Sequence, residues 1–140
     1  MDESRRRRRV AIRWAAIVPA AFLLWYATLL LAGGLAELVL TFCPATARLG
    51  DYCAADWART AERAITVGCA GLAALLIVYC AALLAPAFRL RVALVIYVIG
   101  LVVAYDIATE AGAIPEFFAA LGGGLLGVVA ARGLPQSATV

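Results

Sequence analysis

The sequence predicts an all-α membrane protein, a bundle of four transmembrane helices with both chain termini in the cytoplasm. Three observations support this fold class. The 140-residue chain is 66% apolar and 15% charged, whereas soluble domains hold about 45–50% apolar and about 25% charged residues. Four apolar runs are long enough to cross a bilayer. Arginine is also concentrated on the side of the predicted bundle that holds the termini, as expected for cytoplasmic segments.

The first predicted span covers residues 10–32 and follows a polar, arginine-rich tail at residues 1–9. Its apolar run exceeds the roughly 7–15 residues of a signal-peptide core, so we expect it to remain as a span. Gly33 and Gly34 come next, and they either interrupt the helix or allow it to pack closely. Residues 35–42 are again mostly apolar, which fits the end of a long tilted helix or an interfacial segment.

The one long polar connection, residues 41–63, contains Cys43 and Cys53. In the predicted topology it lies on the outer side of the membrane, in an oxidising compartment where disulfides form. A disulfide between these cysteines would stabilise the loop by roughly 2–3 kcal/mol, and two free thiols are the alternative. Cys69 and Cys80 are 11 residues apart on one predicted helix, about 16 Å, and cannot pair with each other.

Three further spans follow the polar connection. The second covers residues 64–85 and is stopped by Pro86. The third, residues 91–110, is almost unbroken apolar sequence and would be roughly 28–30 Å long as a helix, close to the hydrocarbon thickness of a bilayer. The fourth covers residues 115–131 and begins with a proline, which a first helical turn tolerates. Residues 134–140 form a short tail.

The distribution of arginine gives the bundle a direction. Nine arginines fall on the side of the chain termini, namely Arg5, Arg6, Arg7, Arg8, Arg9, Arg13, Arg89, Arg91 and Arg132. The opposite side has three, Arg48, Arg59 and Arg63. Because cytoplasmic loops carry the excess of positive residues, the terminal side is predicted to be cytoplasmic and to contact anionic lipid headgroups. A basic run directly before an apolar span is a topology signal, so we expect no nucleic-acid partner.

The residue inventory excludes most familiar enzyme chemistry. The chain has no His, Lys or Asn, and its only serines are Ser4 and Ser137 in the tails. An imidazole base, a histidine-ligated metal or haem, a Schiff base and an intramembrane serine nucleophile are therefore all missing. We expect a protein without catalytic activity, cofactor or metal. The alanine-rich, arginine-only usage is typical of a GC-rich bacterial genome, and we expect a multi-pass protein of a bacterial inner membrane.

Acidic residues approach the outer half of the predicted membrane region. They are Glu37, Asp106, Glu110 and Glu116. Asp106 and Glu110 are four residues apart and share one helix face. Intramembrane carboxylates are candidates for proton or cation handling, so Asp106 and Glu110, with Glu37, form a candidate ion site. The alternative is an interfacial or structural role for these acids.

Small residues recur every four positions in the fourth span, at Ala119, Gly123, Gly127 and Ala131. This pattern is a small-xxx-small ridge, which lets the backbone of another helix approach closely. The partner in that contact is an internal helix, another copy of the chain or a different protein, and the pattern does not distinguish between them.

In size and number of spans the chain resembles the small multidrug-resistance transporters and the small fluoride channels. The transporters have a Glu on the first helix, whereas Glu37 falls at the outer end of its span. The glycine-rich motif of the channels is only faintly echoed by Gly123-Gly124-Leu125-Leu126-Gly127-Val128-Val129-Ala130-Ala131-Arg132. Both families often insert in two orientations, which the nine-to-three arginine count argues against. No site is carried over from either family.

The sequence therefore favours a non-catalytic accessory or assembly subunit that acts through helix–helix contacts. Such a protein would work as a homo-oligomer or as a subunit of a larger membrane complex. The alternative is a small proton- or cation-coupled transporter or channel that uses the acidic residues of the outer half of the membrane.

Overall fold

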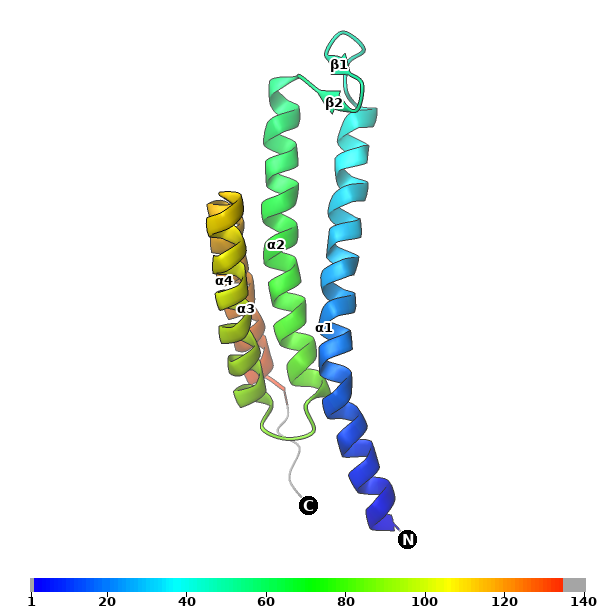
Figure 1. The fold of residues 1–140 in the computed structure, drawn as a ribbon, viewed down its shortest axis with the longest axis vertical. Helices are drawn as coiled ribbons and strands as arrows, with labels where there is room; N and C mark the ends of the chain where they lie inside the picture. The colour runs from blue at the N-terminus through cyan, green and yellow to red at the C-terminus, as the bar shows by residue number, and fades with distance from the viewer. Residues whose placement is uncertain (1, 135–140) are drawn as a thin grey trace.

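The computed structural model describes residues 2–134, without the side chains of Asp2, Arg5 and Arg6. Four helices and one short β-hairpin form the chain (Figure 1), in the order α1 (Asp2–Thr41), β1 (Arg48–Leu49), β2 (Tyr52–Cys53), α2 (Asp56–Leu84), α3 (Arg89–Ala111) and α4 (Ile114–Arg132). All four helices are long and apolar enough to cross a membrane. The prediction of an all-α chain with four candidate spans is therefore confirmed.

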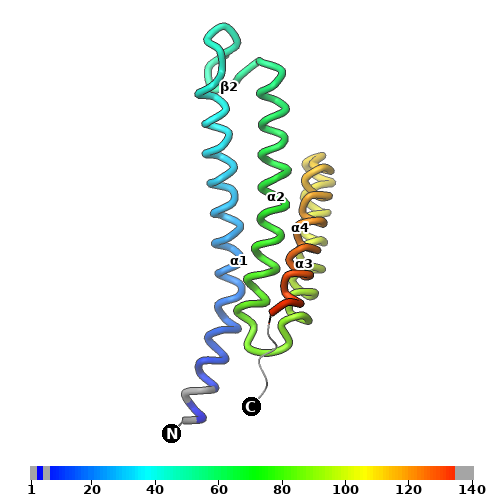
Figure 2. The backbone as a smooth tube through the Cα atoms, turned by 180° about the vertical axis from the view of Figure 1, so that it is seen from behind, coloured from blue at the N-terminus to red at the C-terminus, as the bar shows by residue number. Residues whose placement is uncertain are grey.

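Helix α2 is the centre of the arrangement. Helix α4 packs against α2 and α3, whereas α1 makes its main contacts with α2. Figures 1 and 2 show the start of α1 and the end of α4 on the same side of the bundle and the β-hairpin on the opposite side. We call these sides the terminal end and the hairpin end. The same views show α1 and α2 extending beyond α3 and α4 at the hairpin end.

Proline and glycine set the boundaries of the last three helices. Helix α2 ends at Leu84, two residues before Pro86, which cannot continue the helix. Helix α3 starts after Phe88, whose φ of 54° lies in the left-handed region, and ends at Gly112, whose φ of 67° suits a residue without a Cβ. Pro115 lies in the first turn of α4, where no backbone donor is lost.

Helices α1 and α2 extend beyond the predicted spans. Helix α1 includes most of the arginine-rich tail and continues without a break through Gly33 and Gly34. An added Cβ at either glycine would meet nothing within 4 Å, so they neither interrupt the helix nor form a close contact with the described residues. Helix α2 begins at Asp56, eight residues before the predicted span. Hydropathy locates the lipid-facing part of a helix and does not locate its polar end.

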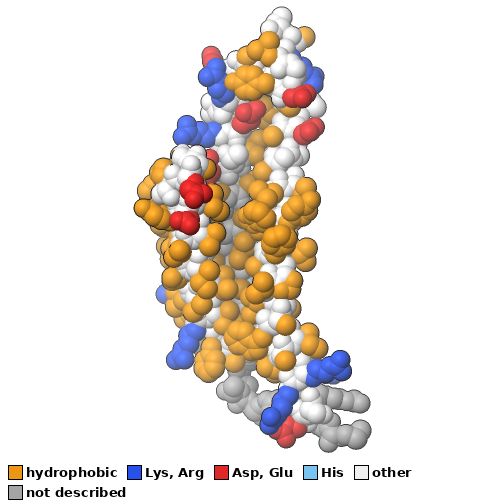
Figure 3. All heavy atoms as spheres, viewed as in Figure 1, with side chains coloured by type: hydrophobic (Ala, Val, Ile, Leu, Met, Phe, Trp, Pro, Cys, Tyr) orange, Lys and Arg blue, Asp and Glu red, His pale blue; other side chains and the backbone are white. Residues whose placement is uncertain are grey.

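The hydrophobic core lies toward the terminal end. Its buried members come from α2, α3 and α4, namely Val78, Ala82, Ala93, Val128 and Ala131. Large apolar side chains elsewhere point away from the protein, as Val18 and Val102 do with exposed fractions of 74% and 65%. Figure 3 shows these apolar side chains covering the middle of the molecule, with charged side chains gathered toward its two ends. This distribution fits a bundle surrounded by lipid.

Candidate functional site

The small-residue ridge of α4 packs against α2 of the same chain. A Cβ added to Gly123 would collide with the backbone carbonyl group of Gly71, and one added to Gly127 would lie 2.9 Å from the carbonyl oxygen of Leu75. In the reverse direction, a Cβ on Gly71 would lie 3.1 Å from the carbonyl oxygen of Ala119. The backbones of α2 and α4 thus touch directly, as small residues at these positions allow. The sequence left three partners open for the α4 ridge. In the structure the partner is an internal helix, α2.

A neighbouring face of α4, about 100° around the helix from Gly123, is also closely packed. A Cβ on Gly124 would lie 2.6 Å from Cδ2 of Tyr97, so the ring of this α3 residue rests on the α4 backbone. The Tyr97 hydroxyl donates a hydrogen bond to the carbonyl oxygen of Leu121 at 3.2 Å. Helices α2, α3 and α4 therefore form a compact unit. Gly123, Gly124 and Gly127 of α4 make its close contacts with α2 and α3.

A groove separates α1 from α3. Its volume is about 440 Å³, within the range of about 300–1,000 Å³ that ligand sites occupy. Helix α2 forms the floor, α1 and α3 form the walls, and the first turns of α4 lie toward the hairpin end. In Figure 3 the face between α1 and α3 is recessed and lined with apolar side chains. The groove exists because α1 makes its main contacts with α2 and not with α3 or α4.

Small side chains dominate the floor of the groove. The floor residues on α2 include Cys69, Ala70, Ala73 and Ala74, and Gly100 contributes to the α3 wall. A Cβ on Gly100 would meet nothing within 4 Å. Small residues on a helix face let a neighbouring backbone approach closely. This surface can therefore accept the ridge of another apolar helix or a long apolar chain.

Few polar groups line the groove, and most of them are already satisfied. The Thr28 hydroxyl donates to its own helix, 2.7 Å from the carbonyl oxygen of Trp25, and the Tyr97 hydroxyl is bonded to α4. Within the described part of the chain, Glu116 is the one carboxylate that lines the groove. Its Oε1 lies 3.2 Å from the Thr66 hydroxyl, which shares its single proton with the carbonyl oxygen of Arg63 at 3.0 Å. The half-buried Glu116 is thus joined to α2 and borders an otherwise apolar surface.

The predicted ion-site residues do not line the groove. Glu37, Asp106 and Glu110 are all exposed, and none is among the groove residues. Within residues 2–134, no group of three or more His, Cys, Asp or Glu residues lies close enough to hold a metal ion. Sequence reasoning placed Glu116 in the acidic set but did not select it as a site residue. Its orientation depends on how α4 is rotated about its axis, which the sequence pattern does not determine.

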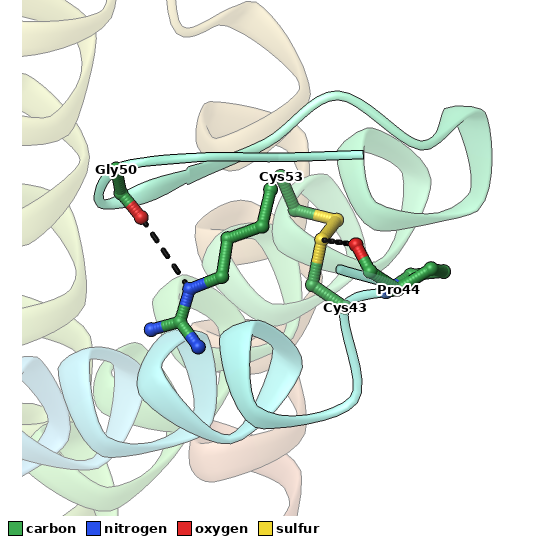
Figure 4. Close-up of a disulfide and its surroundings, with 5 residues drawn as sticks. Cys43, Pro44, Gly50 and Cys53 are labelled. Atoms are coloured by element: carbon green, nitrogen blue, oxygen red, sulfur yellow. Dashed lines mark hydrogen bonds between the residues drawn. A yellow bond between two sulfur atoms is a disulfide. The ribbon is translucent and has the colours of Figure 1, made fainter. Parts of the chain in front are cut away.

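Cys43 and Cys53 form a disulfide at the hairpin end (Figure 4), with their Cα atoms 5.9 Å apart. The bond joins the segment after α1 to strand β2, which pairs with β1 in the register Arg48 with Cys53. Cys53 is fully buried. The Arg48 Nε donates to the carbonyl oxygen of Gly50 at 3.5 Å across the turn. The loop is thereby a compact, cross-linked cap rather than an open connection.

The arginines of the terminal end make few contacts with other elements. Arg13 donates to the carbonyl oxygen of Leu83, 3.1 Å away at the end of α2, where a cation suits the helix dipole. Arg91 lies over the Phe88 ring, 5.1 Å from its centroid. Arg7 pairs with Glu3 at 2.8 Å. The exposed side chains also include Arg8, Arg9 and Arg132, whereas the predicted headgroup contacts of Arg5 and Arg6 lie outside the described side chains.

Comparison of the chain with protein-family models, with curated proteins and with solved structures gives no significant match.

Proposed function

We propose that this protein is a non-catalytic subunit of a membrane assembly and that its groove receives one transmembrane helix of another protein. The open groove with its floor of small residues is the observation that carries this proposal. Four apolar helices suit a multi-pass membrane protein, and the glycine ridge of α4 is used within the chain. The groove is therefore the surface on which an additional helix would find close contact.

The dimensions of the groove suit a helix. Its lining on α2 extends from Thr66 to Val78, and its lining on α3 extends from Ile96 to Ala108. Each of these stretches is about 18 Å long, which is more than three helical turns. Transmembrane helices associate through van der Waals packing against small residues, since lipid removes most of the hydrophobic driving force. A helix aligned with α2 would make such contacts over this length.

The proposed orientation places the terminal end in the cytoplasm of a bacterium and the disulfide-linked hairpin outside the inner membrane. The support is the nine-to-three distribution of arginine, together with the position of the start of α1 and the end of α4 on the same side of the bundle. The disulfide is consistent with an oxidising compartment at the hairpin end. The arginines at the terminal end would contact anionic headgroups.

The alternative, a proton- or cation-coupled transporter, gains no support from the groove geometry. A transport path needs its carboxylates to face a cavity, and Asp106, Glu110 and Glu37 lie outside the groove. Ion flux into liposomes that depends on Asp106 and Glu110 would favour the transporter over the accessory subunit.

A single substitution tests the proposed docking surface. Gly100→Leu places a side chain in the groove without an internal clash, because an added Cβ there meets no atom within 4 Å. Gly68→Leu is the matched control, since Gly68 is also exposed, also has open space and does not line the groove. We expect the native complex extracted in mild detergent to lose a component with Gly100→Leu and to keep it with Gly68→Leu. An unchanged complex with Gly100→Leu would exclude the groove as the docking surface.

A further inference from the structure

On the function proposed above, the helix that enters the groove meets a carboxylate at the hairpin end of an otherwise apolar surface. Among the residues that the structure describes, Glu116 is the one charged residue that lines the groove. An acid in the first turn of α4 is favoured by the helix dipole, but the dipole does not require it to face another helix. Its half-buried side chain reaches Thr66 on α2.

The carboxylate of Glu116 retains capacity for a further partner. A carboxylate has two oxygens and about four acceptor positions. The Thr66 hydroxyl, shared with the carbonyl oxygen of Arg63, occupies one of them at 3.2 Å, and no other described side chain bonds to this group. A charged group beside apolar surface and near the edge of the membrane is stabilised by an opposite charge or by further hydrogen-bond donors. A docked helix would bring such a group within reach.

The charge pattern of the hairpin end argues against a second copy as the occupant. The hairpin end contains more acids than arginines. The acids are Glu37, Asp51, Asp56, Glu62, Asp106, Glu110 and Glu116, and the arginines are Arg48, Arg59 and Arg63. Two copies inserted in the same orientation would lie side by side, with their hairpin ends next to each other. Helix α1 or α3 of a second copy would then bring Glu37, or Asp106 and Glu110, toward Glu116. Like charges so placed repel.

We infer that the groove selects a partner transmembrane helix with an arginine or lysine near its outer end, and that this residue pairs with Glu116. Arginine suits the position well, because its planar guanidinium matches a carboxylate with two parallel hydrogen bonds. The apolar floor supplies the contact area and the Glu116 carboxylate supplies the selectivity. The chain thus distinguishes among apolar helices by one charge.

Cys69 provides a native reporter of groove occupancy. It is a free thiol on the groove floor, whereas Cys80 is a free thiol on the same helix that does not line the groove. We suggest measuring alkylation of both thiols by N-ethylmaleimide in bicelles of defined lipid. The probes are three synthetic leucine–alanine transmembrane peptides with a G-x-x-x-G face, identical except for Arg, Gln or Glu about one turn from one end.

The expected result is protection of Cys69, and not of Cys80, in the order Arg, then Gln, then Glu. The peptide concentration for half-protection should be about fivefold lower for the Arg peptide than for the Gln peptide, the factor that corresponds to one partly screened ion pair. Glu116→Gln should remove this difference while keeping the Thr66 hydrogen bond. Glu110→Gln, which removes a carboxylate near the hairpin end but outside the groove, should preserve it.

The inference and the proposed function fail in different ways. Equal protection of Cys69 by all three peptides would overturn charge selection and leave helix docking in place. If the preference for the Arg peptide persisted in Glu116→Gln, the inference would also be overturned, because the peptide arginine would then be bound by a group other than Glu116. If no peptide protects Cys69 and its alkylation instead follows the bicelle lipid, the groove is a lipid site and both proposals fall.

Discussion

Individual glycines in α4 occupy environments that a sequence pattern cannot separate. Gly122, Gly123 and Gly124 are consecutive, yet a Cβ would meet open space at Gly122, the α2 backbone at Gly123 and the Tyr97 ring at Gly124. The three positions point in directions 100° apart around the helix. Which of them contacts a neighbour is set by the rotation of α4 about its axis. The same rotation places Glu116 toward the groove.

This difference gives a prediction at the residue scale. Gly123→Ala should lower the free energy of unfolding by about 1–3 kcal/mol, because the methyl group would force the α2 backbone to move. Gly122→Ala should be neutral or stabilising by up to about 1 kcal/mol, since alanine has the higher helix propensity. Reversible unfolding of the purified protein in mixed micelles measures both values. Equal losses for the two variants would contradict the α2–α4 contact.

At the scale of elements, the sequence predicted the existence of the helices better than their lengths or partners. Apolar runs predicted the number of helices, and Pro86 and Pro115 marked two of the boundaries. The early start of α2 at Asp56 was missed, because Arg59, Glu62 and Arg63 are poor membrane residues but acceptable helix formers. The partner of the α4 ridge stayed open, since small residues permit a close contact without specifying it.

The disulfide-linked cap provides the prediction at the element scale. Replacing Cys43 and Cys53 with serine should free the hairpin and remove roughly 2–3 kcal/mol of its stability, through greater entropy of the open loop. Backbone amides of residues 42–55 should then exchange faster with solvent, while amides of the α2–α4 contact keep their protection. Hydrogen exchange followed by mass spectrometry separates the two regions. Faster exchange throughout α2 and α4 would show that the cap supports the whole bundle.

At the scale of the whole molecule, the two ends differ in charge and in shape. The terminal end carries nine arginines, and the hairpin end carries the cross-linked cap and most of the acids. The sequence supplied this asymmetry through the positions of arginine. It could not supply the groove, which depends on α1 packing mainly against α2.

The proposed orientation is testable with a membrane-impermeant maleimide on intact cells. In a background with Cys69→Ala and Cys80→Ala, a cysteine at Ser4 should be labelled only after the membrane is opened. A cysteine at Thr46, in the connection between α1 and β1, should be labelled at once. The expectation follows from the arginine excess at the terminal end. The reverse labelling pattern would show the opposite orientation, with the hairpin end and its acids inside the cell.

The projection of α1 and α2 beyond the other helices sets a distance requirement. Thr66 meets Glu116 in the first turn of α4, and α2 begins at Asp56, ten residues earlier. The cap is therefore held about 15 Å beyond the α4 end of the groove. In the proposed orientation, a partner protein that contacted both the groove and the cap would need roughly three helical turns beyond the groove, or a folded module next to the cap. The projecting ends of α1 and α2 therefore set the distance between the groove and the cap. Candidate binding proteins can be sorted by whether they are long enough to span that distance.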